Sequence, residues 1–505
     1  MAITGGSDIA DVKATLAAGR SALLWRKQIA DTETPISAAL KLMQAGRGDF
    51  LLESVEGGSV RGRFSLLGLD PDLVFRANGQ QAEINRQWQT NRDAFTPLTD
   101  DTLTALRALV QQCRADVDPA LPPALACLVG NFGYETIGLV EKLPRPAPNP
   151  ISMPDMLFTR PTVILIFDRL EDALYLVAPL WKEKTTDSDR DIADAQDRLD
   201  AVSARLAGPL PMQPHDQAGD DIAFTPVLEP GRYADMVNKA KEYIMAGDIF
   251  QVVLAQRFTA PFPLPPIALY RALRRINPSP FLYCLDMPGF SLIGSSPEIL
   301  VRVRDGEVTI RPIAGTRPRG KTAAEDAANR DSLLADPKER AEHLMLLDLG
   351  RNDVGRVASA GSVTVTDSYT TEYYSHVMHI VSNVVGALDP KKDALDALFA
   401  GFPAGTVSGA PKVRACEIIA ELEPETRGAY AGGVGYFSPN GDMDSCIVLR
   451  TAVLKDGILH AQAGAGIVAD SDPAYEQREC EAKSGALMAA AKEAVRLSRE
   501  GQFGQ

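Results

Sequence analysis

The sequence predicts an α+β fold, a two-domain sandwich of mainly antiparallel β-sheets with helices packed outside. Short apolar runs alternate with turn residues between Trp25 and Phe167, which is typical of sheet-rich structure. In the second half, strands follow one another without an intervening helix, and such neighbours pair antiparallel. Helical patterns lie between some of these strands, but not in the regular alternation of a doubly wound nucleotide-binding fold.

A change of composition divides the chain. The stretch from Trp181 onward carries one charged helical pattern and then a segment rich in Pro, Gly and Asp, from Pro209 to Asp221. Segments of this composition commonly join domains. We therefore expect an N-terminal domain over residues 20–210 and a C-terminal domain over residues 222–497.

The overall composition is that of a soluble globular protein, with 505 residues, 45% hydrophobic and 23% charged. Its net charge of -14 argues against nucleic acid as the main partner, although a local basic cluster could still bind a small anion. No secretion signal is evident, and no apolar stretch approaches the ~20 residues that span a bilayer. Six cysteines without a C-x-x-C pair indicate reduced thiols. We expect a cytoplasmic protein with no membrane partner.

Two predicted helices carry the pattern Glu-x-x-Glu just after an Asp-Pro start, which favours a helix N-terminus. The acidic positions are Glu339 and Glu342 in the first helix and Glu476 and Glu479, followed by Lys483, in the second. Locally, Glu339 could close a capping box, and the second helix could be a solvated face with a Glu–Lys pair. Four converging carboxylates would instead require a cation, and hard oxygen ligands favour Mg²⁺ over zinc. The absence of H-E-x-x-H argues against a metalloprotease.

Two glycine-containing loops could hold an anion. GTVSGAPK, from Gly405, precedes a helix whose first turn contains Lys412, and helix N-termini present free N–H groups. It is not a Walker A motif, so ATP is not implied. AGAG, around Gly464, joins a strand to the second acidic helix, although a strand-end bulge is the alternative. Tyr430 and Arg450 lie between these loops, and arginine binds carboxylates through paired hydrogen bonds.

Several motifs, taken in their order, resemble the chorismate-utilising enzymes, and most closely the large subunits (component I) of anthranilate synthases. They are IRPIAGTRPRG, ERAEHLMLLDLGRNDVGRV, YSHVMHIVS, FPAGTVSGAPK, YAGGVGYF, DSCIVLR, QAGAGIV and the final Glu-x-x-Glu helix. The resemblance covers Phe224 to Ala490 strongly and the N-terminal part more weakly. It implies a Mg²⁺-dependent lyase that converts chorismate and ammonia to anthranilate and pyruvate, the first committed step of tryptophan biosynthesis.

The resemblance also implies roles for individual residues. Glu342 and Glu479 would bind Mg²⁺, supported by Glu339 and Glu476, and the metal would hold the ring carboxylate of chorismate. Glu298 would protonate the departing 4-hydroxyl, and His379 rather than His376 would be the histidine of the lyase site. From its local pattern alone, His379 reads as a core histidine in an apolar strand. The substrate-binding positions would be Thr316, Thr406, Tyr430, Arg450, Gly464, Ala465, Gly466 and Lys483.

Two positions distinguish between branches of the family that the sequence resembles. Gln251 is one of the predicted catalytic positions. It stands where isochorismate- and salicylate-forming relatives carry a lysine that activates water, and an amide cannot act as that base. Ala314 stands where aminodeoxychorismate synthases tend to have a lysine nucleophile. Both residues favour ammonia as nucleophile, with those two branches as alternatives. A degenerate member retained as an amino-acid sensor and a metal-dependent hydrolase are the other classes considered.

Regulation and a partner follow from the same resemblance. The sequence lacks glutaminase motifs, so a separate glutamine amidotransferase subunit (component II) is the expected partner. Two segments resemble the family's tryptophan site, a strand ending in Ser54 and the turn NPSPF, although a plain strand and a plain turn are the alternative. The inhibitor-binding positions would be Leu52, Glu53, Ser54, Asn277, Pro278, Ser279, Pro280 and Phe281. Ser54 would bond the amino-acid group of L-tryptophan, Glu53 would offset its ammonium, and the ligand would favour a less active state.

Overall fold

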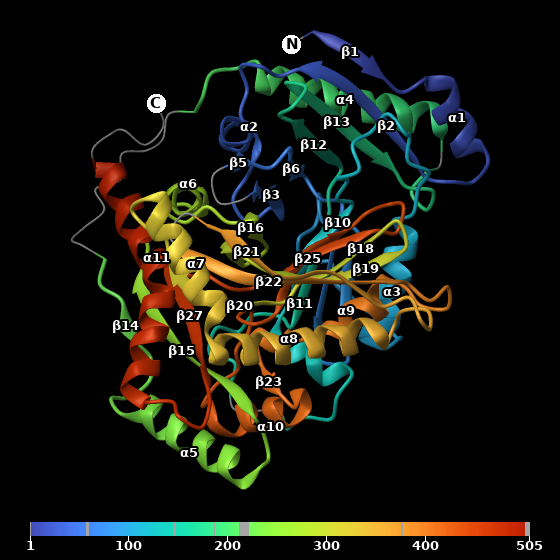
Figure 1. The fold of residues 1–505 in the computed structure, drawn as a ribbon. Coiled ribbons are helices and arrows are strands. Elements are labelled where there is room, and N and C mark those ends of the chain that lie inside the picture. Colours follow the sequence, from blue (N-terminus) through green and yellow to red (C-terminus); the bar gives the residue numbers. More distant parts are fainter. Residues whose placement is uncertain are drawn as a thin grey trace.

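The computed structural model describes residues 2–56, 60–144, 148–185, 187–211, 222–374 and 377–499. Its described part contains two large antiparallel sheets, and helices cover their outer sides (Figure 1). The predicted α+β sandwich is therefore confirmed. Most of the predicted boundary segment, and His376, lie outside the described residues.

The first sheet has 13 strands among the described residues. In spatial order they are β1 (Ile3–Gly6), β2 (Ala22–Ile29), β13 (Ala173–Leu180), β12 (Val163–Asp168), β6 (Phe64–Leu69), β3 (Asp49–Glu53), β16 (Phe281–Met287), β17 (Phe290–Ser296), β26 (Thr451–Lys455), β27 (Ile458–Ile467), β15 (Gln251–Pro261) and β14 (Thr225–Pro226), with β23 (Gly409–Ala410) also paired to β15.

The second sheet has 12 strands in the same described ranges. In spatial order they are β20 (Ile313–Pro318), β22 (Val377–Ala387), β19 (Glu307–Ile310), β18 (Ile299–Arg304), β25 (Met443–Ile447), β24 (Gly433–Phe437), β10 (Leu128–Phe132), β11 (Met156–Arg160), β7 (Leu73–Asn78), β8 (Gln81–Asn85) and β9 (Thr96–Pro97), with β21 (Thr364–Tyr373) also paired to β22. A separate hairpin joins β4 (Val55–Glu56) and β5 (Val60–Arg61).

Helices pack on the outer side of each sheet. Those that contact the first sheet are α1 (Ile9–Ala17), α2 (Pro35–Leu42), α4 (Ser188–Leu206), α5 (Arg232–Ala246), α6 (Pro266–Ile276), α10 (Lys412–Leu422) and α11 (Pro473–Arg499). Those that contact the second are α3 (Thr102–Gln112), α7 (Ala323–Ala335), α8 (Pro337–Gly355) and α9 (Ala394–Gly401). Two 3₁₀ turns, η1 (Tyr134–Leu139) and η2 (Gly405–Val407), complete the described elements.

Both sheets contain strands from both halves of the chain. In the first sheet β3 pairs with β16, which places Leu51 opposite Cys284. In the second, β10 pairs with β24, which places Gly130 opposite Gly435. A single cluster of buried side chains contains residues from both sheets. The two predicted segments are therefore joined through shared sheets, and the domain boundary at residues 210–222 stays a prediction about the chain rather than a division between sheets.

The acidic helices begin where the sequence predicts. Asp336 caps α8, because its side chain accepts hydrogen bonds from the amides of Lys338 and Glu339. The Asp472 side chain accepts from the Tyr475 amide at the start of α11. Glu339 does not close a capping box, because its carboxylate pairs with Arg317 instead, 2.7 Å away. In the described ranges no helix is long and apolar enough to cross a membrane.

Candidate active site

Glu298 lies between β17 and β18 and is only 5% exposed. The Thr406 hydroxyl, on the η2 turn, donates to Glu298 Oε1 over 2.7 Å. Burial raises the pKa of Glu298 to about 8, although the Thr406 hydrogen bond and nearby Arg450 oppose the rise. The carboxyl group is therefore protonated at neutral pH and can deliver a proton to a leaving group.

His379 lies on β22 with 8% of its surface exposed. Its Nδ1 is 3.0 Å from the Gly315 carbonyl oxygen and 3.1 Å from the Thr316 hydroxyl. Because a carbonyl oxygen can only accept, Nδ1 carries the proton and Nε2 keeps its lone pair. Burial lowers the pKa of His379 to about 4, so the imidazole is neutral. The ring of Tyr374 packs edge-on against it at 5.3 Å. Thr316 thus orients the histidine.

Arg450 stands out because it is cationic, half-buried and unpaired. Its backbone has φ 48°, directly before β26. Within the described residues, no carboxylate forms an ion pair with its guanidinium. Burial lowers the pKa of Arg450, and Arg450 in turn lowers the pKa values of both Glu298 and His379, so it acts electrostatically on both groups. An unpaired guanidinium in this position is suited to an anionic substrate.

The end of β27, from Gly464 to Gly466, packs closely against its neighbours and is called the glycine strand below. A Cβ on Gly464 would lie 2.8 Å from the Tyr430 hydroxyl, and one on Gly466 would lie 2.5 Å from Gln251 Nε2. A side chain at Gly464 would also clash with the Leu254 carbonyl oxygen, 2.9 Å from the added Cβ, whereas one at Gly466 would require the end of the Gln251 side chain to move. Ala465 is buried and paired with Leu254. Gln251, on β15, therefore lies directly on this strand.

The Lys483 ammonium group already has two partners in this structure. Its Nζ donates to the Gly464 carbonyl oxygen over 3.0 Å and pairs with Glu479 at 2.7 Å. The lysine thus ties α11 to the glycine strand, and its role in binding substrate stays a prediction.

The four predicted metal ligands lie on α8 and α11, and their charges interact. Burial raises the pKa of Glu342, and nearby Glu339 and Glu479 raise it further. Burial and Glu479 likewise raise the pKa of Glu476. Glu339 is bound by Arg317 and Glu479 by Lys483. Within the described ranges, no three His, Cys, Asp or Glu side chains are placed together as a metal site. The oxygen donors and their mutual repulsion fit a hard cation, but two of the four currently hold side-chain cations.

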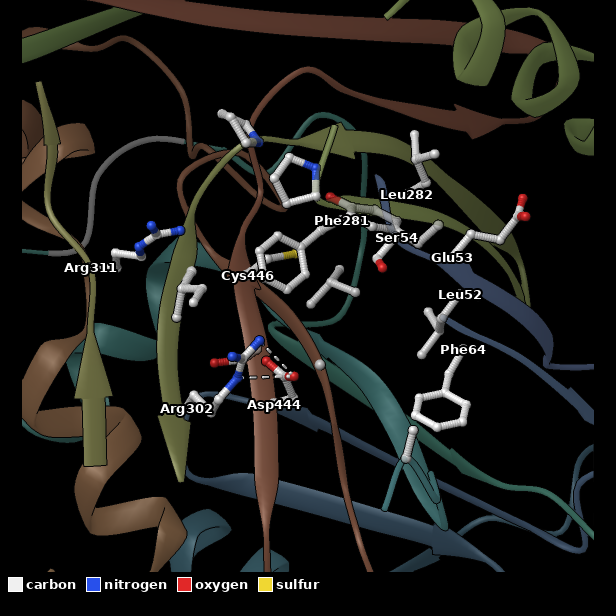
Figure 2. Close-up of a pocket in the computed structure, with 18 of the residues that line it drawn as sticks. Leu52, Glu53, Ser54, Phe64, Phe281, Leu282, Arg302, Arg311, Asp444 and Cys446 are labelled. Atoms are coloured by element: carbon white, nitrogen blue, oxygen red, sulfur yellow. Dashed lines mark hydrogen bonds and ion pairs between the residues drawn. The ribbon is translucent and has the colours of Figure 1, made fainter. Parts of the chain in front are cut away.

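A cavity of about 560 Å³ lies between the sheets and contains much of the predicted inhibitor site. Leu52, Ser54 and Phe281 line it, with the Arg302–Asp444 ion pair on another wall (Figure 2). The cavity is also lined by Glu53, Pro280, Arg311, Tyr374 and Cys446, and by Pro297 and Ile299 on either side of Glu298.

Part of the predicted inhibitor site packs behind this cavity. Asn277 exchanges hydrogen bonds with Ser295, and Ser279 is buried. Pro278 lies in the turn between them. These three residues shape the wall rather than line the space.

Glu53, a predicted inhibitor-binding residue, is held by other side chains in this structure. Its carboxylate accepts hydrogen bonds from Arg169, Arg274 and Tyr270, at 2.8, 2.8 and 2.7 Å. Two guanidinium groups already neutralise it, so it does not offer a free charge to a ligand ammonium. These partners come from distant segments that the local pattern LLES does not reveal, and the place of Glu53 in an inhibitor site stays a prediction.

Sequence reasoning also missed residues that hold the site. Tyr374, which contacts His379, is the first residue of the motif YSHVMHIVS, but nothing in the motif indicates this contact. Arg427 and Glu423 form a buried ion pair behind the site. Their spacing of four residues is a signal for a pair, but nothing in it indicates burial.

Comparisons with known proteins show the family to which the chain belongs. The sequence profile of a family described as chorismate binding enzyme matches residues 49–489. Anthranilate synthase component 1 of Cereibacter sphaeroides is 50% identical over 483 residues, covering 95% of this chain and 97% of the relative. The same component of Thermus thermophilus is 46% identical over 464 residues, covering 92% and 96%.

Solved structures agree as well. Anthranilate synthase component I from Streptococcus pneumoniae has a TM-score of 0.76 at 37% identity, covering 85% of this chain and 92% of that chain. The menaquinone-specific isochorismate synthase of Escherichia coli has a TM-score of 0.70 at 19% identity, covering 96% and 98%, which supports the fold alone. With a family match over residues 49–489 and relatives identical at nearly half of their positions, the chain belongs to the chorismate binding enzymes.

Proposed function

We propose that this chain is the large subunit, component I, of a cytoplasmic anthranilate synthase. It converts chorismate and ammonia to anthranilate and pyruvate, the first committed step of tryptophan biosynthesis. The observation that carries the proposal is the combination of a protonated Glu298, a neutral His379 and an unpaired Arg450 that acts on both. The names of the relatives support the same reaction.

The reaction needs an acid, a base and an anion site. Ammonia adds at C2 of chorismate while the C4 hydroxyl leaves, and the Glu298 carboxyl supplies the proton that converts this hydroxyl to water. The C2 proton is then lost and the enolpyruvyl group departs as pyruvate. His379 Nε2 keeps its lone pair because Nδ1 donates to the Gly315 carbonyl oxygen, so we assign this nitrogen the proton transfers. Arg450, Tyr430 and the Gly464–Gly466 backbone hold a substrate carboxylate, and Thr406 orients Glu298.

Mg²⁺ is part of the proposal, bound by Glu342 and Glu479 with Glu339 and Glu476 in support. When bound, it would neutralise the ring carboxylate of chorismate and stabilise negative charge that develops in the transition state. Burial and then repulsion by neighbouring carboxylates raise the pKa values of Glu342 and Glu476, and the repulsion supports the proposal because a divalent cation would relieve it. Binding requires Arg317 and Lys483 to release Glu339 and Glu479.

Two side chains favour ammonia over water or an enzyme amine as nucleophile. Gln251 lies on the glycine strand and its amide cannot activate water. Ala314, on β20, has no amine. Both features support anthranilate as product rather than isochorismate, salicylate or aminodeoxychorismate.

We expect the isolated chain to make anthranilate from chorismate with ammonium salts at mildly alkaline pH, where free ammonia is available. Glutamine should serve only after an amidotransferase subunit is added, because the sequence lacks glutaminase motifs. Anthranilate fluorescence measures both activities. Glutamine-dependent product from the pure chain would contradict the partner assignment, and no product with either donor would contradict the proposed reaction.

Feedback inhibition by tryptophan belongs to the proposal. The cavity has room for an amino acid, and two of its lining residues, Pro297 and Ile299, flank Glu298. A third, Tyr374, packs against His379 and donates to Glu372, which pairs with Arg311 on the cavity wall. A ligand that displaces these residues would disturb both the acid and the base.

Replacing Ser54 by Phe is expected to leave anthranilate formation close to normal. The tryptophan concentration needed for half inhibition should rise by at least about 10-fold, which lies within the usual range of coupling between an inhibitor site and an active site. Ser54 already lies against Gly62, where an added Cβ would be 1.7 Å from its hydroxyl, so a larger side chain must project into the cavity. Inhibition curves for both proteins, at equal activity without tryptophan, measure the effect. Full inhibition of Ser54→Phe, or indifference of the wild type to millimolar tryptophan, would refute the regulatory site.

A further inference from the structure

Arg427 is a buried cation that has no role in the proposed reaction steps. It is 2% exposed, and its Nε and Nη2 lie 2.9 and 2.6 Å from the two carboxylate oxygens of Glu423, which is 5% exposed. Removing two charges from water costs free energy that their attraction often fails to offset. A buried pair of this kind is therefore weak evidence for stability and raises the question of what else it does.

The remaining hydrogen bonds of the pair go to the backbone of the site. Arg427 Nη1 donates to the Val407 carbonyl oxygen and Nη2 to that of Val253, each over 2.7 Å. Glu423 Oε1 accepts from the Ala255 amide over 2.9 Å. On this edge of β15 the short strand β23 pairs only with residues 251 and 252. The two side chains therefore take the place of a neighbouring strand along the next residues.

The two carbonyl groups that bind Arg427, those of Val407 and Val253, each lie next to a residue proposed to contact substrate. Val407 directly follows Thr406, whose hydroxyl holds Glu298. Val253 lies opposite Gly466 in the β15–β27 pairing. The guanidinium also lies over the ring of Tyr430, 5.5 Å from its centroid. One planar group thus contacts the acid-holding turn, the strand beside the glycines and the tyrosine.

We propose that Arg427, fixed by Glu423, is a positioning residue that sets the η2 turn against the end of β27 and so aligns Glu298 with bound chorismate. The inference rests on the proposed function. A guanidinium suits the task because its planar fork makes several hydrogen bonds in fixed directions, which a lysine ammonium cannot reproduce.

The test is Arg427→Lys, which keeps the charge and removes the fork. We expect a folded protein in which kcat/KM for chorismate, with ammonium as donor, falls by about 10- to 100-fold, the scale of a small misplacement of reacting groups. Arg160→Lys is the matched control, since Arg160 is also buried and holds Asp72 through two hydrogen bonds of 2.9 Å, but it lies on β11 with no contact to the predicted site residues. It should lower Tm and leave kcat/KM of the folded enzyme unchanged.

A double-mutant cycle separates positioning from general loosening. If Arg427 acts through the η2 turn, Arg427→Lys and Thr406→Val should combine to much less than the product of their separate effects on kcat/KM. Glu423→Gln is the second variant, and it should show the same coupling with Thr406→Val.

The outcomes are distinct. The inference would be overturned if the effects in the cycle multiplied, or if Arg427→Lys lost no more kcat/KM than Arg160→Lys does. It would also be overturned if neither Arg427→Lys nor Glu423→Gln folded, because the pair would then be structural. Absence of anthranilate formation by the wild type would instead refute the proposed function.

Discussion

Glu298→Gln is expected to lower kcat for ammonia-dependent anthranilate formation by about 100- to 10,000-fold, the usual contribution of a positioned general acid. The substitution keeps the shape of the side chain and its hydrogen bond with Thr406, but a glutamine amide is too weak an acid to protonate the departing hydroxyl. Because the wild-type carboxyl is already protonated at neutral pH, neutral Gln should not lower stability. Steady-state kinetics and thermal unfolding measure the two quantities.

Asp286→Asn provides the control for this prediction. Asp286 is also a buried carboxyl whose pKa is raised by burial, but it lies on β16, hydrogen-bonded to Ser291 and away from the site. Its substitution should leave kcat unchanged. Near-normal kcat in Glu298→Gln would remove Glu298 from the mechanism.

The raised pKa also gives a pH profile with a definite sign. The active form of Glu298 is protonated, so activity is lost as pH rises through about 8. The concentration of free ammonia rises over the same range and would mask the loss, so kcat must be measured at constant free ammonia. The wild type should then decline above about pH 8, and the residual activity of Glu298→Gln should lack that decline.

The elements that local sequence patterns control were predictable. Asp336 and Asp472 begin the two acidic helices as their Asp-Pro pairs indicate, because capping depends on residues within one turn. Strand β12, with the apolar run VILIF, is buried throughout, as such a run indicates. In these cases the sequence signal and the structural cause lie in the same few residues.

The parts that depend on distant partners were not predictable. The Glu53 carboxylate pairs with Arg169, in the turn after β12, and with Arg274 on α6, and the local pattern LLES reveals neither partner. The tautomer of His379 depends on the carbonyl of Gly315, 64 residues away in the chain. The sharing of both sheets by the two halves likewise depends on pairings such as β3 with β16. Such contacts follow from the whole fold.

The metal assignment predicts a large effect for Glu342→Gln. We expect Mg²⁺ to bind at least about 10- to 100-fold more weakly, since loss of a ligand should cost no less than loss of a group that only orients one. Mg²⁺-dependent turnover should fall to background. The fold should survive, because burial and the neighbouring carboxylates already disfavour the charged form of Glu342, and a neutral amide removes that repulsion.

Two readouts independent of turnover test this expectation. Calorimetric titration measures Mg²⁺ affinity, and thermal unfolding measures the rise in Tm that Mg²⁺ causes by binding only the folded protein. In Glu342→Gln the metal-free Tm should stay level or rise, while the Mg²⁺-induced rise disappears, and Glu479→Gln should lose the same response. Glu481→Gln is the matched control, since Glu481 is exposed on the same helix as Glu479 and accepts a hydrogen bond from Gln477. A normal Mg²⁺ response in Glu342→Gln would show that Glu342 is not a ligand, and an equal loss in Glu481→Gln would show that the response does not depend on the four proposed carboxylates.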